Sequence, residues 1–401
     1  MNCRSCNNTI TPFFSLGDMP LVNSFLTKKQ IPKEKKYDLT VAFCKNCFLV
    51  QLVYAVPPKD LFRHYLYFSS TSSSFLKHCD EISLHFKKKL HLTKKSLVLE
   101  LASNDGALLS CFKKLGMKIL GVDPAKNIAE VANKKGITTI PEFFNLALAK
   151  KLANKKVQAD LVYGANVLAH VPEIVDFISG VKTILSESGT AAFEFPYIKG
   201  LMENKFDTIY HEHVFYFSLV ALRNLFRSVN LEIYDVEQTP MQGGSLLIYA
   251  CHTGKFSVTA RVTRLIDKET TSGYKNIRTY KKVEQNTDML RRTLTSLLQK
   301  IKKDGKTVAA YSAPAKGNIL LNYFNLGKFL SFIVDKSSAK QGLYTPGTHL
   351  EVLPPDAIIL KEPDYLLILC WNIANEVMRE QANFKKTGGK FIVPIPKIKI
   401  I

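Results

Sequence analysis

The stretch SLVLELASNDGALLSCFKKLGMKILGVDP, residues 96–124, decides the fold. It begins with an apolar run, Leu97–Leu101, continues through a small-residue turn and an amphipathic segment, and returns as a second apolar run that ends at Asp123. Strand, helix and strand in this order predict a βαβ unit of a doubly wound, mostly parallel sheet. Acidic residues close both strands, Glu100 and Asp123, and Gly106 lies in the turn between strand and helix. A nucleoside cofactor needs this combination, because the turn lets the backbone approach the ligand and a carboxylate can bind ribose hydroxyls.

The turn in this unit separates two classes of cofactor. Dinucleotide-binding turns carry G-x-G-x-x-G, whereas the chain has E-x-x-x-N-x-G followed by GVDP, which resembles the pattern of S-adenosylmethionine (SAM) methyltransferases. Those enzymes generally have glycine where Ala102 stands, and alanine is expected to be tolerated there if its φ is negative. The residues expected to bind SAM are Glu100, Ala102, Asn104, Gly106, Asp123, Pro124 and Asn166.

The same sheet is expected to continue with strands at Leu161–Tyr163 and Thr190–Phe195. In doubly wound folds the carboxyl ends of the strands face the ligand. The side chains that follow or end these strands are therefore candidates for the crevice: Asn166, His170, Glu194 and Tyr197. A second possibility for His170 is that it caps the following helix.

Two C-x-x-C pairs lie near the start of the chain, Cys3 with Cys6 and Cys44 with Cys47. Two thiolates in a tight turn supply two corners of a tetrahedron, and a second pair supplies the other two. The pattern predicts structural zinc in a small N-terminal lobe; a thiol–disulfide pair or a site that no longer binds metal are the alternatives. The isolated cysteines are expected to be buried small hydrophobes: Cys79, Cys111, Cys251 and Cys370.

Length and composition bound the remaining possibilities. The 401 residues are expected to form two or three domains. No apolar run has the roughly 18 residues that a membrane span needs, and MNCRSCNNTI does not resemble a secretion signal, so we expect a cytoplasmic protein without membrane association. The net charge of +21 comes mostly from scattered lysines. Because the basic residues do not concentrate on one segment, a solvated surface or a phosphorylated substrate is favoured over nucleic acid.

The C-terminal part reads as a second α/β unit. Residues 253–304 are rich in Lys, Arg and Thr with apolar residues at helical spacing, which predicts a connecting amphipathic helix. Alternating strands and helices follow, with a strand-to-helix junction, SAPAKGN, whose backbone and Lys316 could hold a diphosphate. The predicted α/β organisation is a zinc-binding lobe at 1–68, a Rossmann-like methyltransferase domain at 69–252, the connector at 253–304, and a smaller Rossmann-like domain at 305–401.

The stretch DTIYHEHVFYFS, residues 207–218, concentrates His, Glu and Tyr. His211 and His213, two residues apart, would point to one face of a strand and could ligate a metal, although no third ligand is evident. A catalytic acid–base cluster and a purely structural polar loop are the other interpretations.

Together these motifs resemble the SAM-dependent deoxysugar C-methyltransferases, in particular nucleotide-sugar C-3-methyltransferases of the tetronitrose-pathway type. The resemblance rests on the order, over nearly the whole chain, of the Cys pairs flanking PLVNSF, then YLYFSSTSSS, LELASNDG, GVDPAKNIA, FDTIYHEHVFYFS, GGSLLIY and APAKGN…YTPGTH. It implies methyl transfer from SAM to a ring carbon of a dTDP-linked 4-keto-6-deoxysugar, and a structural zinc ion. A monomer or weak oligomer is expected.

The resemblance also implies roles for individual residues. His213 would be the base that removes the ring proton, Glu212 would orient or polarise it, and Tyr210 would donate to the enolate oxygen, with Tyr67 as a further active-site tyrosine. Substrate contacts are expected from Asn23, Ser24, Phe25, Ser70, His170, Lys316 and Asn318. Methylation at another ring carbon or at an oxygen, and a nucleic-acid-binding or catalytically inactive methyltransferase-like protein, are the alternatives.

Overall fold

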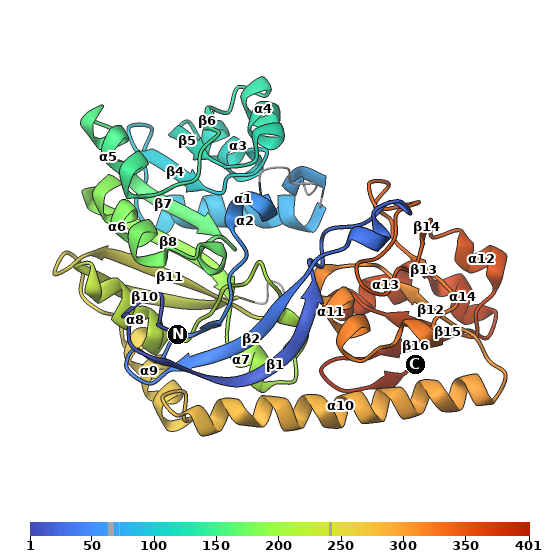
Figure 1. The fold of residues 1–401 in the computed structure, drawn as a ribbon. Helices are drawn as coiled ribbons and strands as arrows, with labels where there is room; N and C mark the ends of the chain where they lie inside the picture. The colour runs from blue at the N-terminus through green and yellow to red at the C-terminus, as the bar shows by residue number, and fades with distance from the viewer. Residues whose placement is uncertain (63–67, 72, 240–242) are drawn as a thin grey trace.

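The computed structural model describes residues 1–62, 68–71, 73–239 and 243–401, and Figure 1 shows their arrangement. An N-terminal antiparallel sheet, a central seven-stranded sheet and a C-terminal six-stranded sheet follow one another along the chain. Tyr67, predicted to be in the active site, lies outside the described residues. No helix in the described ranges combines the length and apolar character of a membrane span.

The N-terminal sheet has the order β1-β2-β3-β9 and is antiparallel throughout. Its strands are β1 (Ile10–Pro20), β2 (Lys36–Cys44), β3 (Val50–Leu52) and β9 (Phe215–Tyr216). The fourth strand comes from the segment directly after His213, so the zinc-binding lobe expected from residues 1–68 is completed by a strand from far along the chain. The Leu52 amide also donates to the Val214 carbonyl at 2.8 Å. This pairing fixes the histidine-rich segment against the lobe.

The central sheet confirms the predicted doubly wound domain, with the order β10-β11-β8-β7-β4-β5-β6. Its strands are β4 (Leu97–Leu101), β5 (Lys118–Val122), β6 (Thr139–Ile140), β7 (Ala159–Ala165), β8 (Leu185–Pro196), β10 (Leu231–Thr239) and β11 (Ser245–His252). Strands β6, β5, β4, β7 and β8 are parallel, and β10 and β11 extend the sheet as an antiparallel edge. Strand order therefore reverses at β4, where a doubly wound sheet opens its ligand crevice.

Helices cover both faces of this sheet and complete its core (Figure 1). They are α1 (Pro58–Phe62), α2 (Ser73–Lys89), α3 (Ala107–Lys114), α4 (Lys126–Lys134), α5 (Leu146–Asn154), α6 (Ile174–Ile184) and α8 (Leu219–Ser228). The short α7 (Lys199–Met202) packs against the long helix of residues 277–303 instead. The amphipathic pattern of α3 turns its apolar side to the sheet, where Leu109 and Phe112 are fully buried.

The connector forms two helices, α9 (Ala260–Thr271) and α10 (Ile277–Lys303), where one was expected. The 27-residue α10 runs beneath both the N-terminal sheet and the C-terminal domain (Figure 1). Its apolar face is buried at regular helical spacing through Tyr280, Leu294 and Leu298, so it fixes the two domains relative to each other.

The C-terminal sheet has the order β14-β13-β12-β15-β16-β17 and is parallel except for β17. Its strands are β12 (Val308–Tyr311), β13 (Ile333–Val334), β14 (Val352–Leu353), β15 (Tyr365–Ile368), β16 (Lys390–Val393) and β17 (Lys399–Ile400). Its helices are α11 (Ala315–Tyr323), α12 (Ala357–Lys361), α13 (Ala374–Glu380) and α14 (Ala382–Lys386). This confirms the second, smaller Rossmann-like unit.

Candidate active site

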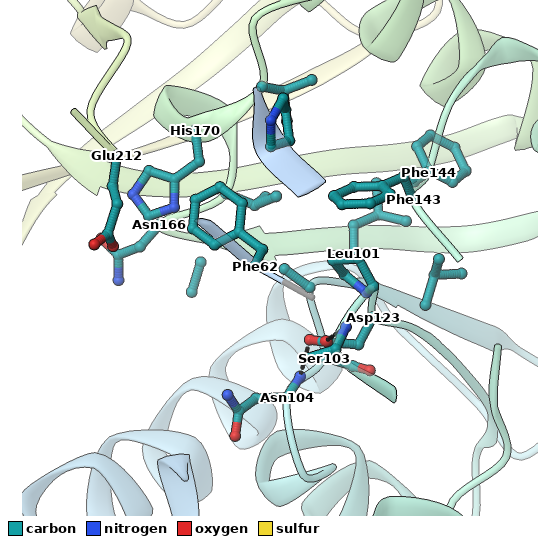
Figure 2. Close-up of a pocket in the computed structure, with 18 of the residues that line it drawn as sticks. Phe62, Leu101, Ser103, Asn104, Asp123, Phe143, Phe144, Asn166, His170 and Glu212 are labelled. Carbon is teal, nitrogen blue, oxygen red and sulfur yellow. Dashed lines mark hydrogen bonds between the residues drawn. The ribbon is translucent and has the colours of Figure 1, made fainter. Parts of the chain in front are cut away.

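A cavity of about 660 Å³ opens at the carboxyl ends of β4, β5 and β7. Figure 2 shows Asp123, Phe143 and Phe144 toward one end of it and Glu212, His170 and Phe62 toward the other. The cavity thus joins the predicted cofactor residues to the histidine-rich segment. The site residues predicted from the sequence that line it are Asn23, Glu100, Ala102, Asn104, Asp123, Pro124, Asn166, His170, Tyr210, Glu212 and His213.

The cofactor end is built by the turn after β4. Asp123 accepts hydrogen bonds from the Asn104 and Ala125 amides, each at 2.9 Å, and each carboxylate oxygen keeps a second lone pair. Gly106 has a φ of 78°, and a Cβ there would come within 2.8 Å of the Ile137 side chain. Glycine is therefore required in this turn, although Gly106 itself does not line the cavity.

Glu100 contributes a buried acidic group to the same end. Burial, followed by the charges of Asp123 and Asp105, raises the pKa of Glu100 well above its ordinary value. Its Oε2 atom has no hydrogen-bond partner in the described chain. A buried carboxylate oxygen needs a donor, and SAM carries a positive charge and an ammonium donor. The residues present therefore fit this cofactor.

The expectation for Ala102 was wrong in one respect. Its φ is 56°, in the left-handed region, rather than negative. For alanine this conformation costs about 1–2 kcal/mol, and the alanine persists because the turn is held by hydrogen bonds on both sides, including that from the Asn104 amide to Asp123.

Replacing Ala102 by glycine is therefore expected to stabilise the domain by about 1 kcal/mol, because relief of the strain exceeds the greater chain entropy of unfolded glycine. Thermal unfolding with and without SAM measures the effect. A lower Tm for Ala102→Gly than for wild type would contradict it, and Ala149→Gly, in the interior of α5, serves as a control that should destabilise.

The opposite end of the cavity centres on His213, which is 5% exposed. Its Nδ1–H donates to the Thr208 carbonyl at 2.9 Å, so Nε2 carries the lone pair, and the Tyr210 hydroxyl lies 2.7 Å from Nε2. Burial, followed by the neighbouring His170, lowers the pKa of His213 well below its usual range. The imidazole is therefore neutral and can accept a proton at Nε2.

Glu212 does not orient His213 as predicted. The Oε1 atom of Glu212 accepts a hydrogen bond from the side-chain nitrogen of Asn23 at 2.5 Å. The His213 ring is oriented instead by its hydrogen bond to the Thr208 carbonyl. Burial raises the pKa of Glu212 to about 7, although the hydrogen bond from Asn23 opposes the shift. The cavity therefore contains a carboxyl group that exchanges its proton near neutral pH.

The His170 ring stacks on the rings of Phe62 and His213. Its ring lies 5.6 Å from the Phe62 ring and 5.2 Å from the His213 ring. Burial lowers the pKa of His170 to about 4, and its Nε2 has no hydrogen-bond partner in the described chain. Helix α6 has no side-chain cap, so His170 does not cap it and instead faces the cavity.

The metal interpretation of the histidine-rich segment does not hold for the described residues. The segment forms a turn rather than a strand, and His211 points away from His213 to contact the Tyr37 carbonyl at 3.1 Å. The one group of potential metal ligands that the described chain brings together is Cys3, Cys6, Cys44 and Cys47, whose Sγ atoms all lie within 4.8 Å of one another.

This cluster fits a tetrahedral zinc ion. Cys3 lies 3.5 Å from Cys47 and Cys6 lies 3.5 Å from Cys44 between Sγ atoms. The hydrogen bond between the Cys3 and Cys47 thiols lowers the pKa of Cys3 and raises the pKa of Cys47, so Cys3 ionises first and the bound metal would stabilise the remaining thiolates. The buried Gln51 side chain donates to the Cys3 sulfur at 3.1 Å. With four thiolates no coordination position stays open, so the zinc is structural.

Several predicted substrate residues lie outside the cavity lining: Ser24, Phe25, Ser70, Lys316 and Asn318. Ser24 is exposed, and Phe25 packs under Lys340 at 5.2 Å. Asn318 is fully buried and donates to the Val22 carbonyl at 2.8 Å. The contacts of Phe25 and Asn318 join the N-terminal lobe to the C-terminal domain.

Two other crevice candidates have structural partners. Glu194 accepts from Tyr163 and Thr239 and pairs with His78 at 2.9 Å, and the Tyr197 hydroxyl donates to Glu269 at 2.8 Å.

Sequence reasoning missed the aromatic wall of the cavity, Phe143 and Phe144. They follow β6, so the rule that ligands lie at the carboxyl ends of parallel strands could have found them. Phe62 gave no such signal, because it reaches the cavity from α1 in the N-terminal part of the chain.

Comparison with known proteins agrees with this geometry. Residues 3–62 match a family described as zinc binding, residues 75–236 a family described as "Methyltransferase domain", and residues 240–396 a family described as "C-methyltransferase C-terminal domain". The chain is 36% identical over 404 residues to the C-methyltransferase NovU of Streptomyces niveus, covering 100% of this chain and 96% of that protein.

Similar solved structures include the magnesium protoporphyrin IX methyltransferase of Synechocystis PCC 6803 with bound SAM, at 14% identity over 50% of this chain and 99% of that one, with a TM-score of 0.37. The PH0226 protein of Pyrococcus horikoshii OT3 covers 49% of this chain and 97% of its own at 14% identity and a TM-score of 0.39. The full-length match and the three domains lead to one conclusion: this chain belongs to the SAM-dependent C-methyltransferases with an N-terminal zinc-binding domain.

Proposed function

We propose that the enzyme methylates carbon 3 of the sugar ring in a nucleotide-linked 4-keto-6-deoxysugar, with dTDP as the nucleotide. The observation that carries the proposal is the neutral His213 imidazole with its Nε2 lone pair directed to Tyr210 at the end of the cofactor cavity. A base beside a hydroxyl donor is suited to removing a proton from a carbon next to a ketone. Such a carbon loses its proton only when the negative charge that grows on the ketone oxygen is stabilised.

In this proposal Asp123, Glu100 and the turn around Asn104 hold SAM, which supplies an electrophilic methyl group. His213 Nε2 takes the proton from the ring carbon while the Tyr210 hydroxyl turns from Nε2 to the ketone oxygen and donates to the enolate. Thr208 keeps Nδ1 protonated throughout, so the proton can enter only at Nε2. The stacked side chains of His170 and Phe62 keep water from the His213 ring. The enzyme thus contributes proton removal and alignment.

Asn23 and Glu212 would bind a polar group of the sugar at the same end of the cavity. We assign further active-site contacts to Asn166 and His170, which line the cavity, and to Tyr67 by family resemblance. A cytoplasmic location follows from the proposed substrate, because nucleotide sugars are made and used there.

The proposal is tested with a panel of 4-keto-6-deoxy nucleotide sugars and SAM. The expected result is a product heavier by one CH₂ unit for at least one dTDP sugar, together with S-adenosylhomocysteine. If only sugars without a 4-keto group are methylated, the enolate mechanism fails.

Glu212→Gln is expected to make the protein more stable at alkaline pH and less active. The folded pKa of about 7 exceeds the ordinary 4.5, so wild type loses stability as pH rises between these values. Above pH 7 the full penalty is on the order of 3 kcal/mol. Glutamine removes the penalty and keeps the oxygen that Asn23 contacts. Tm should therefore exceed that of wild type at pH 8 and match it near pH 4.5.

Activity provides the second measurement for this variant. If ionised Glu212 serves the reaction, wild-type kcat/KM rises with pH through about 7, and this limb disappears in Glu212→Gln. If Glu212→Gln has the same pH profile of activity as wild type, Glu212 takes no part in the reaction. If the variant is less stable than wild type at pH 8, burial does not penalise the charge of Glu212. Glu237→Gln is the control for loss of a paired carboxylate, because Glu237 forms an ion pair with Lys89.

A further inference from the structure

The strand order of the C-terminal sheet predicts a second ligand crevice. The order, β14-β13-β12-β15-β16-β17, reverses direction between β12 and β15. In open α/β sheets ligands bind outside the carboxyl ends of the two strands at this point. Here these ends lead into α11, which carries Lys316, and into the turn that begins with Trp371.

A side chain of the catalytic domain enters this crevice. The indole nitrogen of Trp371 donates to Asp207 Oδ2 at 2.6 Å, and Asp207 is completely buried. Two cations face the same indole ring: Lys316 Nζ lies 5.2 Å from its centroid and Lys205 Nζ 5.9 Å. Burial raises the pKa of Asp207 to about 6, and the charge of Lys316 and the hydrogen bond from Trp371 oppose this shift. At neutral pH the crevice therefore holds Asp207 as it would hold an acidic ligand.

Asp207 is adjacent to the residue that sets the histidine tautomer. It lies in the short turn Phe206–Thr208, and the Thr208 carbonyl accepts the Nδ1–H of His213 at 2.9 Å. The next turn is closed by the His213 amide, which donates to the Tyr210 carbonyl at 2.9 Å. Any rotation of the peptide after Asp207 would move the Thr208 carbonyl and release the imidazole. The anchored carboxylate therefore limits how His213 can be oriented.

We propose that Trp371 and Asp207 form an anchor between domains: the C-terminal domain uses its switch-point crevice to hold its own chain, and thereby positions His213 with the lone pair on Nε2. Asp207 and Trp371 are positioning residues that do not touch substrate. The proposal rests on the proposed role of His213 as the base. It also replaces the expectation that Lys316 binds a diphosphate, because the Lys316 ammonium lies over the Trp371 ring.

Proton removal is measured by wash-in of deuterium at the carbon next to the ketone, with S-adenosylhomocysteine in place of SAM and the dTDP sugar that the panel identifies. Trp371→Phe keeps an aromatic ring and loses the donor; Asp207→Leu loses the acceptor. Both should slow wash-in by about 10–100-fold, the range seen when residues that orient metal-bound histidines are replaced, and SAM binding measured by calorimetry should not weaken. Asp207→Asn keeps an acceptor and should recover most of the rate.

Because Trp371 is the single tryptophan of the chain, its fluorescence reports on the anchor directly. Asp207→Leu should shift the emission, and dTDP alone should leave wild-type emission unchanged, since the crevice is already filled. Asp288→Leu, which removes an exposed partner of Arg291 on α10, is the matched control and should behave as wild type in both assays.

Wild-type wash-in rates in both Trp371→Phe and Asp207→Leu would overturn the proposal, as would a saturable change of Trp371 emission on adding dTDP. If either variant fails to fold, ¹⁵N spectra of wild-type His213 decide: protonation at Nε2 instead of Nδ1 overturns it. Failure of the proposed function looks different, because then His213→Asn itself exchanges deuterium at the wild-type rate.

Discussion

His213→Asn is expected to slow deuterium wash-in and methyl transfer by about 10²–10⁴, the usual contribution of a general base. SAM affinity should stay close to that of wild type, because His213 stacks on His170, which lies toward the other end of the cavity from Asp123 (Figure 2). Asparagine can still bond to the Thr208 carbonyl but offers no basic nitrogen. The rate of the proton step should therefore fall while ground-state binding remains.

The matched control is His211→Asn, two residues away in the same turn. His211 is equally buried but contacts the Tyr37 carbonyl and does not line the cavity, so most of the wash-in rate should remain. If His213→Asn exchanges deuterium as fast as wild type, the base is another group, with Glu212 next to be tested. If it loses zinc or unfolds, the segment is structural.

Cys44→Ser is expected to abolish stoichiometric zinc and to unfold the N-terminal lobe, because structural zinc sites contribute on the order of 10 kcal/mol to folding. Cys44 ends β2, the strand that pairs with both β1 and β3. Since β3 pairs with β9 directly after His213, wash-in should fall as well. Metal analysis and thermal unfolding measure the first two effects.

Cys79→Ser is the control for this experiment. Cys79 is 1% exposed within α2 and lies outside the cysteine cluster, so its replacement should leave zinc content unchanged. Wild-type protein purified without chelator should hold one zinc per chain. Substoichiometric zinc in wild type, or unchanged zinc in Cys44→Ser, would rule out the four-thiolate site.

The local elements could be predicted because their signals are local. The unit from β4 to β5 follows from a hydrophobic pattern within 29 residues, and each C-x-x-C pair encodes its own turn. The backbone of Ala102 could not be predicted in the same way, since its positive φ is imposed by hydrogen bonds around it rather than by its own preference.

Contacts over long distances in sequence explain most of what was missed. Glu212 is held by Asn23, 189 residues earlier, and Asp207 by Trp371, 164 residues later. Hydrophobic periodicity carries no information on such polar pairs. The motif YHEH therefore led to three residues that line the cavity, Tyr210, Glu212 and His213, whereas the partner of Glu212 and the tautomer of His213 needed the folded chain.

The most direct test of the central claim uses SAM labelled with ¹³C at its methyl group and the 4-keto-6-deoxy nucleotide sugar that the panel identifies. The carbon–proton correlation spectrum of the product shows what the methyl is bonded to. We predict a methyl on a ring carbon, with coupling from the methyl protons to the neighbouring ketone carbon and no signal from a methoxy group. A methoxy signal, or label found only in methanol, would contradict the account.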